Sequence, residues 1–403
     1  MSVEALASQR AKASAGEVFL AFLKLGLTSF GGPVAHLGYF RAEFVERRRW
    51  LDEPAYADLV ALCQFLPGPS SSQVGIAIGL SRAGYLGALA AWTAFTTPSA
   101  ILLLLFGFGI GWLGGAAGSS SLHGLKIAAV AVVALAVLQM ARSLAPDRNR
   151  ATLAVAAAAL ALLLPTTVGQ LGGIVLGAAV GLAFLRDGAT AEKATLPLVV
   201  GRSVALTSLL LFFALLIGLP LLASVTGSQA VRLVDAFYRA GSLVFGGGHV
   251  VLPLLQAQVV PPGWVSNDVF LAGYGAAQAV PGPLFTFSAY LGAVMGPQPN
   301  GLAGALLCLL AIFLPSFFLV IGILPFWEAL RGKPAAEAAL KGVNAAVVGI
   351  LLAAFYNPVF TAAITKPEDF ALAVTDFLLL FMWRTPPWLV VLLSAAGGAV
   401  LSL

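Results

Sequence analysis

Charged residues are scarce in this sequence. Asp, Glu, Lys and Arg make up only 10% of the 403 residues, whereas 60% are hydrophobic. The runs that contain none of these four residue types include 83–125, 151–185, 203–231, 240–267, 269–327 and 342–365. A helix that crosses the hydrocarbon core of a bilayer needs about 20 predominantly apolar residues. The composition therefore excludes a soluble globular protein and indicates a polytopic membrane protein.

Motifs of catalysis and metal binding are also missing. The two cysteines, Cys63 and Cys308, have the spacing of neither a metal site nor a redox pair. The sequence contains no G-x4-GK[ST] phosphate loop, no H-E-x-x-H and no G-x-S-x-G. We therefore expect a protein without enzymatic activity, cofactor, metal or nucleic-acid partner. An intramembrane enzyme, for instance one acting on lipid, stays open as a distant alternative.

Two parts of the sequence are similar to each other. FLKLGLTSFGG at 22–32 matches FYRAGSLVFGG at 237–247, and WLDEPAYADLVALCQFLPGP at 50–69 matches WVSNDVFLAGYGAAQAVPGP at 264–283. Further along, Pro98 matches Pro315, and GLKIAAV at 124–130 matches GVNAAVV at 342–348. We divide the chain into a cytoplasmic tail (1–16), a first repeat (17–190), a basic loop with a linker helix (191–231) and a second repeat (232–403).

The charges indicate that the two repeats have opposite orientations in the membrane. Before the shared Trp, the first repeat has Arg47, Arg48 and Arg49, whereas the second has Pro-Pro-Gly at 261–263. Conversely, GGAAGSSS at 114–121 is uncharged, whereas its counterpart around 328–341 contains three basic residues. Because Lys and Arg favour cytoplasmic loops, the second repeat is predicted to be inverted relative to the first.

We expect an all-α membrane protein with broken or re-entrant helical hairpins at 17–49, 55–81, 233–263 and 267–296. Crossings are predicted at 84–112, 121–141, 151–164, 168–185, 203–224, 299–325, 342–357, 370–383 and 386–402. This path places the N-terminus in the cytoplasm, the C-terminus outside, and only Arg232 and Lys366 among the basic residues outside. The charges fit re-entrant hairpins and pairs of full spans equally well. The predicted crossings 151–164 and 370–383 have about 14 residues each. They reach roughly 21 Å, which is less than the thickness of the hydrocarbon core of the bilayer.

Pro-Gly-Pro interrupts both repeats, at Pro67-Gly68-Pro69 and at Pro281-Gly282-Pro283. A helix interior does not accommodate proline, and non-helical backbone at membrane depth is tolerated where it is buried in protein or lines a watery cavity. Inverted repeats with matching broken helices are typical of secondary transporters, whose substrate site lies between the repeats. The pattern favours a transport site at the breaks, and a structural kink without ligand contact is the alternative.

The new helices that begin at the breaks favour an anion as substrate. Helix N-termini carry partial positive charge, and hydroxyls such as those of Ser70 to Ser72 and Thr286 can add hydrogen-bond donors. Lys24 and Arg239, at the same repeat position, are cations predicted at membrane depth. The candidate anion-binding residues are Lys24, Phe30, Gly31, Gly32, Gln64, Pro67, Gly68, Pro69, Ser70, Ser71, Lys126, Arg239, Phe245, Gly246, Gly247, Gln278, Pro281, Gly282, Pro283, Thr286 and Asn344.

These cations have a second interpretation, because long side chains can extend to the interface. For Lys24 and Arg239, substrate attraction and this snorkelling are both open. Lys126, one turn from a predicted helix end, fits snorkelling better, and its repeat partner is the neutral Asn344.

Three further residues are weak candidates for proton coupling. Asp58 is an acid placed deep in a predicted hairpin, where a carboxylate is a functional candidate by default. His36 and His249 follow the two glycine breaks and can titrate near neutral pH. Packing in a loop or at the interface is the alternative for both histidines.

SFGGP at 29–33, VFGGG at 244–248, the two Q-x2-PGP segments and KGVNAAVVGILLAAFYNPV at 341–359 resemble the chromate ion transporter (CHR) family, in its long form with two fused halves. The resemblance extends from Glu17 to the C-terminus. It implies a bacterial inner-membrane protein that exports chromate, a tetrahedral dianion similar to sulfate, under an electrochemical gradient, and so confers chromate resistance. The family's motifs carry over onto Phe30 to Pro33, Pro67 to Pro69, Phe245 to Gly248 and Pro281 to Pro283.

The membrane potential suffices to drive such an efflux. Moving two negative charges out of a negative interior gains about 4.6 kcal/mol per 100 mV, at roughly 2.3 per charge. A proton antiport is allowed by this arithmetic but not required. An importer or exchanger of sulfate or a related oxyanion is the alternative, because an amide cradle recognises charge and tetrahedral shape. The lipid bilayer is an expected partner, and a homodimer is left open.

Overall fold

The computed structural model describes residues 13–110, 116–164, 167–186, 200–245, 247–330 and 333–401. Within these ranges the chain is helical and contains no strand. Most of the predicted tail (1–16), most of the basic part of 191–231 and the candidate residue Gly246 lie outside the described residues. The predicted all-α membrane fold is confirmed.

The helices of the first repeat follow the predicted breaks. They are α2 (Ala15–Thr28), α3 (Gly32–Arg41), the π-helix η1 (Ala42–Arg47), α4 (Glu53–Phe65), α5 (Ser70–Ile110), α6 (Ala116–Leu144), α7 (Arg148–Leu163) and α8 (Thr167–Phe184). The linker helix α9 (Arg202–Thr226) leads to the second repeat.

The helices of the second repeat are broken at the matching glycine and Pro-Gly-Pro positions. They are α10 (Gln229–Leu243), η3 (Gly248–Val250), α11 (Val251–Val259), α12 (Asn267–Ala277), η4 (Leu284–Thr286), α13 (Phe287–Val294), α14 (Gly301–Ile323), η5 (Leu324–Phe326), α15 (Trp327–Leu330), α16 (Pro334–Ala354), η6 (Phe355–Phe360), α17 (Thr361–Ala363), α18 (Pro367–Phe381) and α19 (Pro387–Val400).

Side-chain caps explain where several of these helices begin. The Asp52 carboxylate accepts a hydrogen bond from the backbone N–H of Ala55 at 3.0 Å, and the Asp147 carboxylate accepts one from that of Arg150 at 2.9 Å. Ser266 caps α12 in the same way. Each cap satisfies one of the backbone donors that the first helical turn leaves without an intrahelical partner.

Within the described residues, five segments are long and apolar enough to cross a membrane: Ser70–Ile110, Ser120–Leu144, Arg202–Thr226, Gly301–Leu330 and Pro334–Ala363. They contain the long crossings expected from the sequence. α5 is not one straight rod, because Ala83 and Gly84 have non-helical backbone angles. The chain reverses there so tightly that a Cβ on Gly79 would lie 2.3 Å from the carbonyl oxygen of Gly87. The predicted hairpin and crossing are therefore distinct within α5.

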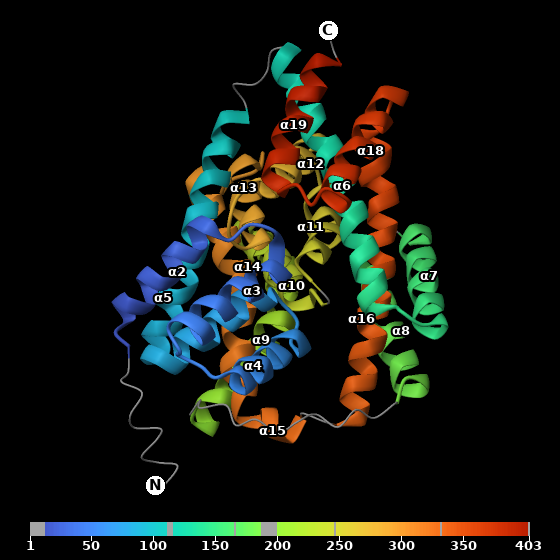
Figure 1. Ribbon diagram of the computed structural model, residues 1–403. Coiled ribbons are helices and arrows are strands. Elements are labelled where there is room, and N and C mark those ends of the chain that lie inside the picture. The colour runs from blue at the N-terminus through green and yellow to red at the C-terminus, as the bar shows by residue number, and fades with distance from the viewer. Residues whose placement is uncertain are drawn as a thin grey trace.

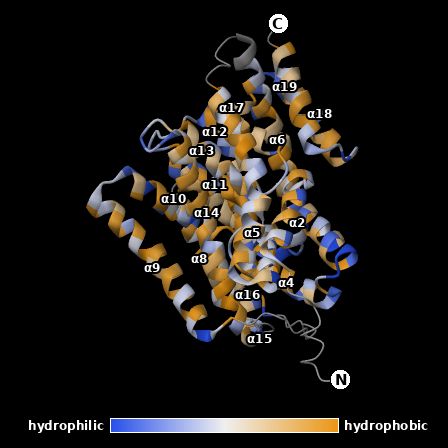
Figure 2. Cartoon of the chain, turned by 90° about the vertical axis from the view of Figure 1, so that its left-hand side faces the viewer, coloured by the Kyte–Doolittle hydropathy of each residue, from blue (hydrophilic) through white to orange (hydrophobic). Residues whose placement is uncertain are grey.

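The linker helix presents an apolar stripe on one side. Leu206, Leu210, Phe213, Ile217 and Leu221 recur every three or four residues and are all exposed, a spacing that places them on one helix face. Figure 2 shows α9 as a mostly hydrophobic helix along one edge of the molecule. α9 packs against α10 and α14 on its other side, so its exposed stripe is suited to lipid.

The two repeats exchange their short helix pairs. α7 and α8 of the first repeat pack against α16 of the second, whereas α18 and α19 of the second repeat pack against α6 of the first. Figure 1 shows α18 and α19 beside α6, at the end of the molecule where the C-terminus lies. The repeats therefore form one interleaved body, in which long helices of one repeat support the short helices of the other.

Candidate functional site

Two backbone hydrogen bonds join the breaks of one repeat to those of the other. The N–H of Gly68 donates to the carbonyl of Val244 at 2.7 Å, and the N–H of Gly282 donates to the carbonyl of Ser29 at 2.8 Å. Each glycine is the centre of a Pro-Gly-Pro, and each carbonyl immediately precedes a Phe-Gly-Gly. The four breaks therefore meet, and the repeat relation is preserved in their contacts, as expected for a site between inverted repeats.

Glycine is required at the centre of both Pro-Gly-Pro segments. Gly68 has φ +122° and Gly282 has φ +93°, which side-chain-bearing residues rarely adopt. A Cβ on Gly68 would lie 3.0 Å from the Ser316 hydroxyl, and one on Gly282 would lie 2.9 Å from the Ser99 hydroxyl. These serines follow the repeat-related prolines of the two long crossings, so each break fits against a proline-containing helix of the other repeat.

The contacts change one detail of the expected cradle. The sequence predicts that amides at the breaks face a substrate, but those of Gly68 and Gly282 are bonded to the opposite repeat. α5 begins at Ser70, so Pro69 directly precedes the helix. The Ser71 hydroxyl is buried 3.3 Å from His36 Nδ1, and the Thr286 hydroxyl donates to the Pro283 carbonyl at 2.7 Å.

A cavity of about 270 Å³ opens beside the joined breaks. Both repeats contribute to its wall. The lining residues are Gly31, Gly32, Val132, Leu135, Ala136, Gln139, His249, Ala277, Gln278, Val280, Gly282, Leu284, Leu380, Arg384, Thr385 and Pro387. The predicted candidates Gly31, Gly32, Gln278, Gly282 and His249 are thus brought together in one place.

Helix N-termini converge on this cavity. α3 begins at Gly32 and α19 at Pro387, and both residues line the wall. Leu284, the first residue of η4, lies there as well. Since helix N-termini carry partial positive charge and unpaired N–H groups, the wall is suited to an anion. Among the described residues that line it, Arg384 is the one charged side chain.

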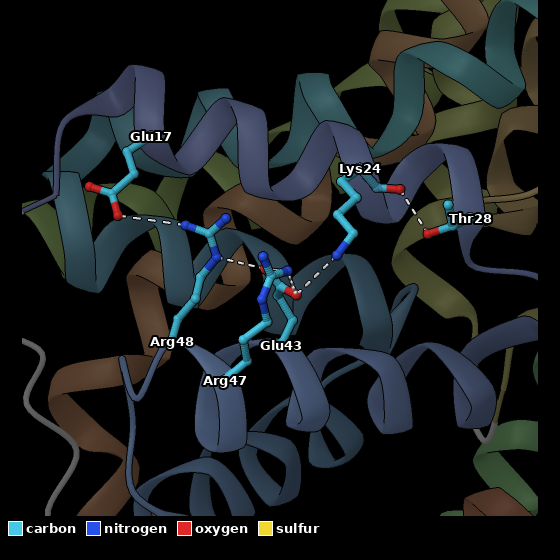
Figure 3. Close-up of polar contacts among 6 residues, drawn as sticks. All are labelled: Glu17, Lys24, Thr28, Glu43, Arg47 and Arg48. Carbon is cyan, nitrogen blue, oxygen red and sulfur yellow. Dashed lines mark hydrogen bonds and ion pairs between the residues drawn. The ribbon is translucent and has the colours of Figure 1, made fainter.

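Lys24 does not reach the cavity. Its ammonium lies 3.6 Å from the carboxylate of Glu43, and 55% of its side chain is exposed. Figure 3 shows Lys24, Arg47 and Arg48 directed towards Glu43, with Arg48 also extending towards Glu17. Burial opposes the charge on Glu43, but the hydrogen bonds from Arg48 and Arg47 and the nearby Lys24 together hold the pKa of Glu43 below its ordinary value.

The other predicted cations are paired in the same manner. Arg239 forms an ion pair with Asp235, one turn earlier on α10. The Lys126 ammonium lies 2.9 Å from the carboxylate of Asp268 on α12. Neither residue lines the cavity, so each of the three predicted cations has a carboxylate partner away from it.

The proton-coupling candidates occupy three different surroundings. The Trp327 indole N–H donates to the Asp58 carboxylate at 3.1 Å, and His36 is buried against Phe95. His249 lines the cavity, with its Nδ1 2.8 Å from the Tyr274 hydroxyl. Of the three, His249 is therefore the one in reach of a bound substrate.

The remaining described candidates do not line the cavity. Gln64 is exposed, whereas its counterpart Gln278 is in the cavity wall. The Phe30 ring lies 6.5 Å from that of Trp388 at the start of α19, and the Asn344 side-chain oxygen is buried without a hydrogen-bond partner among the described residues. The others are buried or half-buried at the breaks: Pro67, Ser70, Phe245, Gly247, Pro281 and Pro283.

Sequence reasoning missed Arg384, Thr385, Gln139 and the buried acid Asp376. The predicted path placed Arg384 at a cytoplasmic helix end, where topology alone accounts for a basic residue. The signal that could have found it is the shortness of 370–383 and 386–402, since a connection between two short helices does not reach the far side of a bilayer. Asp376 lies one turn before Leu380 on α18 and is 1% exposed.

A family model described as "Chromate transporter" matches residues 16–184 and 231–399, which are the two repeats. The chain belongs to the chromate transporter family. It is 29% identical over 394 residues to a chromate transport protein of Pseudomonas aeruginosa, covering 95% of this chain and 91% of that protein. It is 27% identical over 398 residues to a chromate transport protein of Cupriavidus metallidurans, covering 96% and 92%. A probable chromate transport protein of Synechococcus elongatus is 26% identical over 362 residues, covering 83% and 81%. No solved structure matches this chromate transporter family member.

Proposed function

We propose that this chain is a secondary transporter that exports chromate across a bacterial inner membrane. The observation that carries the proposal is the cavity at the joined breaks, where the N-termini of α3 and α19 meet. Chromate is a tetrahedral dianion. The partial positive charge at helix N-termini can stabilise such an anion even where no Lys or Arg side chain contacts each of its oxygens. The relatives named as chromate transport proteins support the substrate.

A second, smaller cavity supports alternating access as the mechanism. It measures about 50 Å³ and includes Leu162, Ile350, Ala353, Ala354 and Asn357 in its wall. These five positions match Leu380, Val132, Leu135, Ala136 and Gln139 of the larger cavity at the repeat offset of 218 residues. The two cavities are therefore lined by repeat-related residues, and they differ in volume. In the opposite state of the cycle, we propose, their sizes are exchanged.

The membrane potential supplies the driving force in this proposal. Two charges moving across 100 mV release about 4.6 kcal/mol, from roughly 2.3 per charge, and each 1.4 kcal/mol is a factor of ten in concentration. A potential of 100 mV, negative inside, therefore supports a chromate gradient of about 2,000-fold. In this proposal the N-terminus lies in the cytoplasm and the C-terminus outside, as the charge pattern predicts.

The test uses purified protein in liposomes loaded with chromate, with a potassium gradient and valinomycin to set the potential and equal pH on both sides. We expect chromate to leave faster when the interior is negative than at zero potential, and protein-free liposomes to show no such effect. A rate of chromate efflux that does not change with the membrane potential would refute the electrogenic mechanism. The absence of any chromate movement would refute the proposed transport of chromate.

Uptake or exchange of sulfate is the second candidate, favoured by the charge and shape that the two anions share. Cells that express the protein distinguish the directions. Lower chromate accumulation than in control cells, reversed by a protonophore, indicates export. Higher accumulation that excess sulfate suppresses indicates an importer or exchanger.

A further inference from the structure

Arg384 lies in the connection between two helices that are too short to span a bilayer. α18 has 15 residues and α19 has 14, so they reach about 22 and 21 Å at 1.5 Å per residue, against a core of about 30 Å. Both occupy the end of the molecule near the C-terminus (Figure 1). Neither helix therefore crosses the whole core, and in their connection Arg384 lines the cavity beside Gly31, Gly32 and Gly282.

The backbone at Arg384 holds an uncommon conformation. Its φ is +53°, a left-handed value that among the described non-glycine residues occurs only here and at Arg49. The next N–H, that of Thr385, donates to the carbonyl of Leu379 at 3.0 Å and so closes the end of α18. Side-chain-bearing residues persist in such conformations where the surrounding structure imposes them, and they are frequent at ligand sites.

Arg384 differs from the predicted cations in its ion pairing. Lys24, Arg239 and Lys126 each have a carboxylate partner, whereas none of the described residues forms an ion pair with Arg384. The described wall of the cavity contains no Asp or Glu. The positive charge of Arg384 and the N-terminus of α19, three residues later, therefore act on the same space.

We propose that Arg384 binds the transported dianion and determines its selection by charge. This inference rests on the proposed function and names the residue that gives the cavity its full positive charge. The planar guanidinium can donate two parallel hydrogen bonds to two oxygens of one tetrahedral oxyanion, a geometry that a lysine ammonium does not reproduce.

The charge belongs to one of the two repeat-related cavities. At the offset of 218 residues the counterpart of Arg384 is Thr166, which lies outside the described residues. The described wall of the smaller cavity has amides, those of Gln170, Gln256 and Asn357, and no charged side chain. Arg384 therefore makes the anion affinity of the two cavities unequal, and the dianion binds at the larger one.

The test compares Arg384→Gln, Arg384→Lys and Arg384→Gly with Arg49→Gln in the liposome assay. Arg49 is the matched control, because it is an exposed arginine with the same φ of +53° that does not line the cavity. We expect Arg384→Gln to raise the KM for chromate about tenfold or more, as loss of charge-assisted hydrogen bonds does. Arg384→Lys should give an intermediate KM and Arg49→Gln the wild-type KM.

Arg384→Gly separates charge from backbone strain. Glycine adopts the positive φ without strain but carries no charge, so its KM should match that of Arg384→Gln. A wild-type KM in either the Gln or the Gly variant overturns the inference. If the wild-type protein itself moves no chromate, the proposed function fails, and that result is distinct from the failure of Arg384.

A labelling experiment on the wild-type protein provides a measurement that does not depend on the variants. Phenylglyoxal modifies arginine side chains, and peptide mass spectrometry reports the modified positions. We expect chromate to slow modification of Arg384 several-fold and to leave the rate at Arg49 unchanged. Equal rates at Arg384 with and without chromate, in a protein that transports chromate, also overturn the inference.

Discussion

At the scale of single residues, two glycines hold the breaks together. Gly68 and Gly282 adopt positive φ, donate across the repeats, and leave no room for a Cβ beside Ser316 and Ser99. Sequence reasoning identified both positions from Pro-Gly-Pro. It did not foresee that their amides bond to Val244 and Ser29 instead of facing a substrate, because that depends on which segments of the other repeat lie opposite.

We predict that Gly68→Ala and Gly282→Ala each destabilise the protein. The left-handed backbone costs a residue with a Cβ roughly 1–2 kcal/mol, and the steric contact adds to it. The control is Gly227→Ala, because Gly227 has φ +61° and only the tip of the Arg232 side chain near its Cβ position. Thermal unfolding in detergent should give a lower midpoint for the two break variants than for the control, and equal midpoints would contradict the packing argument.

At the scale of elements, Glu43 ties the first long helix to the π-helix that follows the break. Lys24 and Glu17 belong to α2, and Arg47 and Arg48 stand at the end of η1 (Figure 3). The Glu43 side chain is only 6% exposed. Sequence reasoning assigned the arginines to topology alone, since an acid among basic residues is indistinguishable from loop charge until the helices pack.

We predict that Glu43→Gln lowers the stability by about 1.5–3 kcal/mol, the range for hydrogen bonds to charged groups. Because the folded pKa of Glu43 is lowered, its stabilisation is complete above the unfolded value of about 4.3. It is lost as the pH falls further through the folded value. Denaturant unfolding between pH 7 and pH 3 should show this loss in the wild type and not in the variant. A variant with the wild-type pH profile would refute the assignment.

Element boundaries were largely predictable from the sequence. Charge-free runs and breaks at Pro and Gly gave the hairpins, the long crossings and the short pairs, because a bilayer imposes length and apolarity on each segment. The partners of those segments were not predictable. α7 and α8 pack on α16, and α18 and α19 pack on α6. The sequence does not predict these pairs, because the apolar face of one helix can pack against the apolar face of many others.

At the scale of the whole molecule, the two repeat-related cavities predict opposite responses to substrate. Gln139 lines the larger cavity and Asn357 lines the smaller one. The test uses the variants Gln139→Cys and Asn357→Cys. The native Cys63 and Cys308 are buried, so an impermeant maleimide reports the new thiols. With molybdate, a tetrahedral dianion that spares thiols, we expect labelling to slow at one position and to accelerate at the other. Slowing or acceleration at both positions would contradict an exchange of cavity sizes.

The sequence alone determined the membrane class, the inverted repeat, the places where the helices break and the family, because composition, periodicity and motif spacing are properties of the chain itself. The tertiary structure alone decided which of these residues meet. It paired Lys24 and Lys126 with carboxylates on other helices and brought Arg384 to the cavity beside Gly31 and Gly282. The physical reason is that a charge acts over a few ångströms in space, and distance along a chain does not fix that separation.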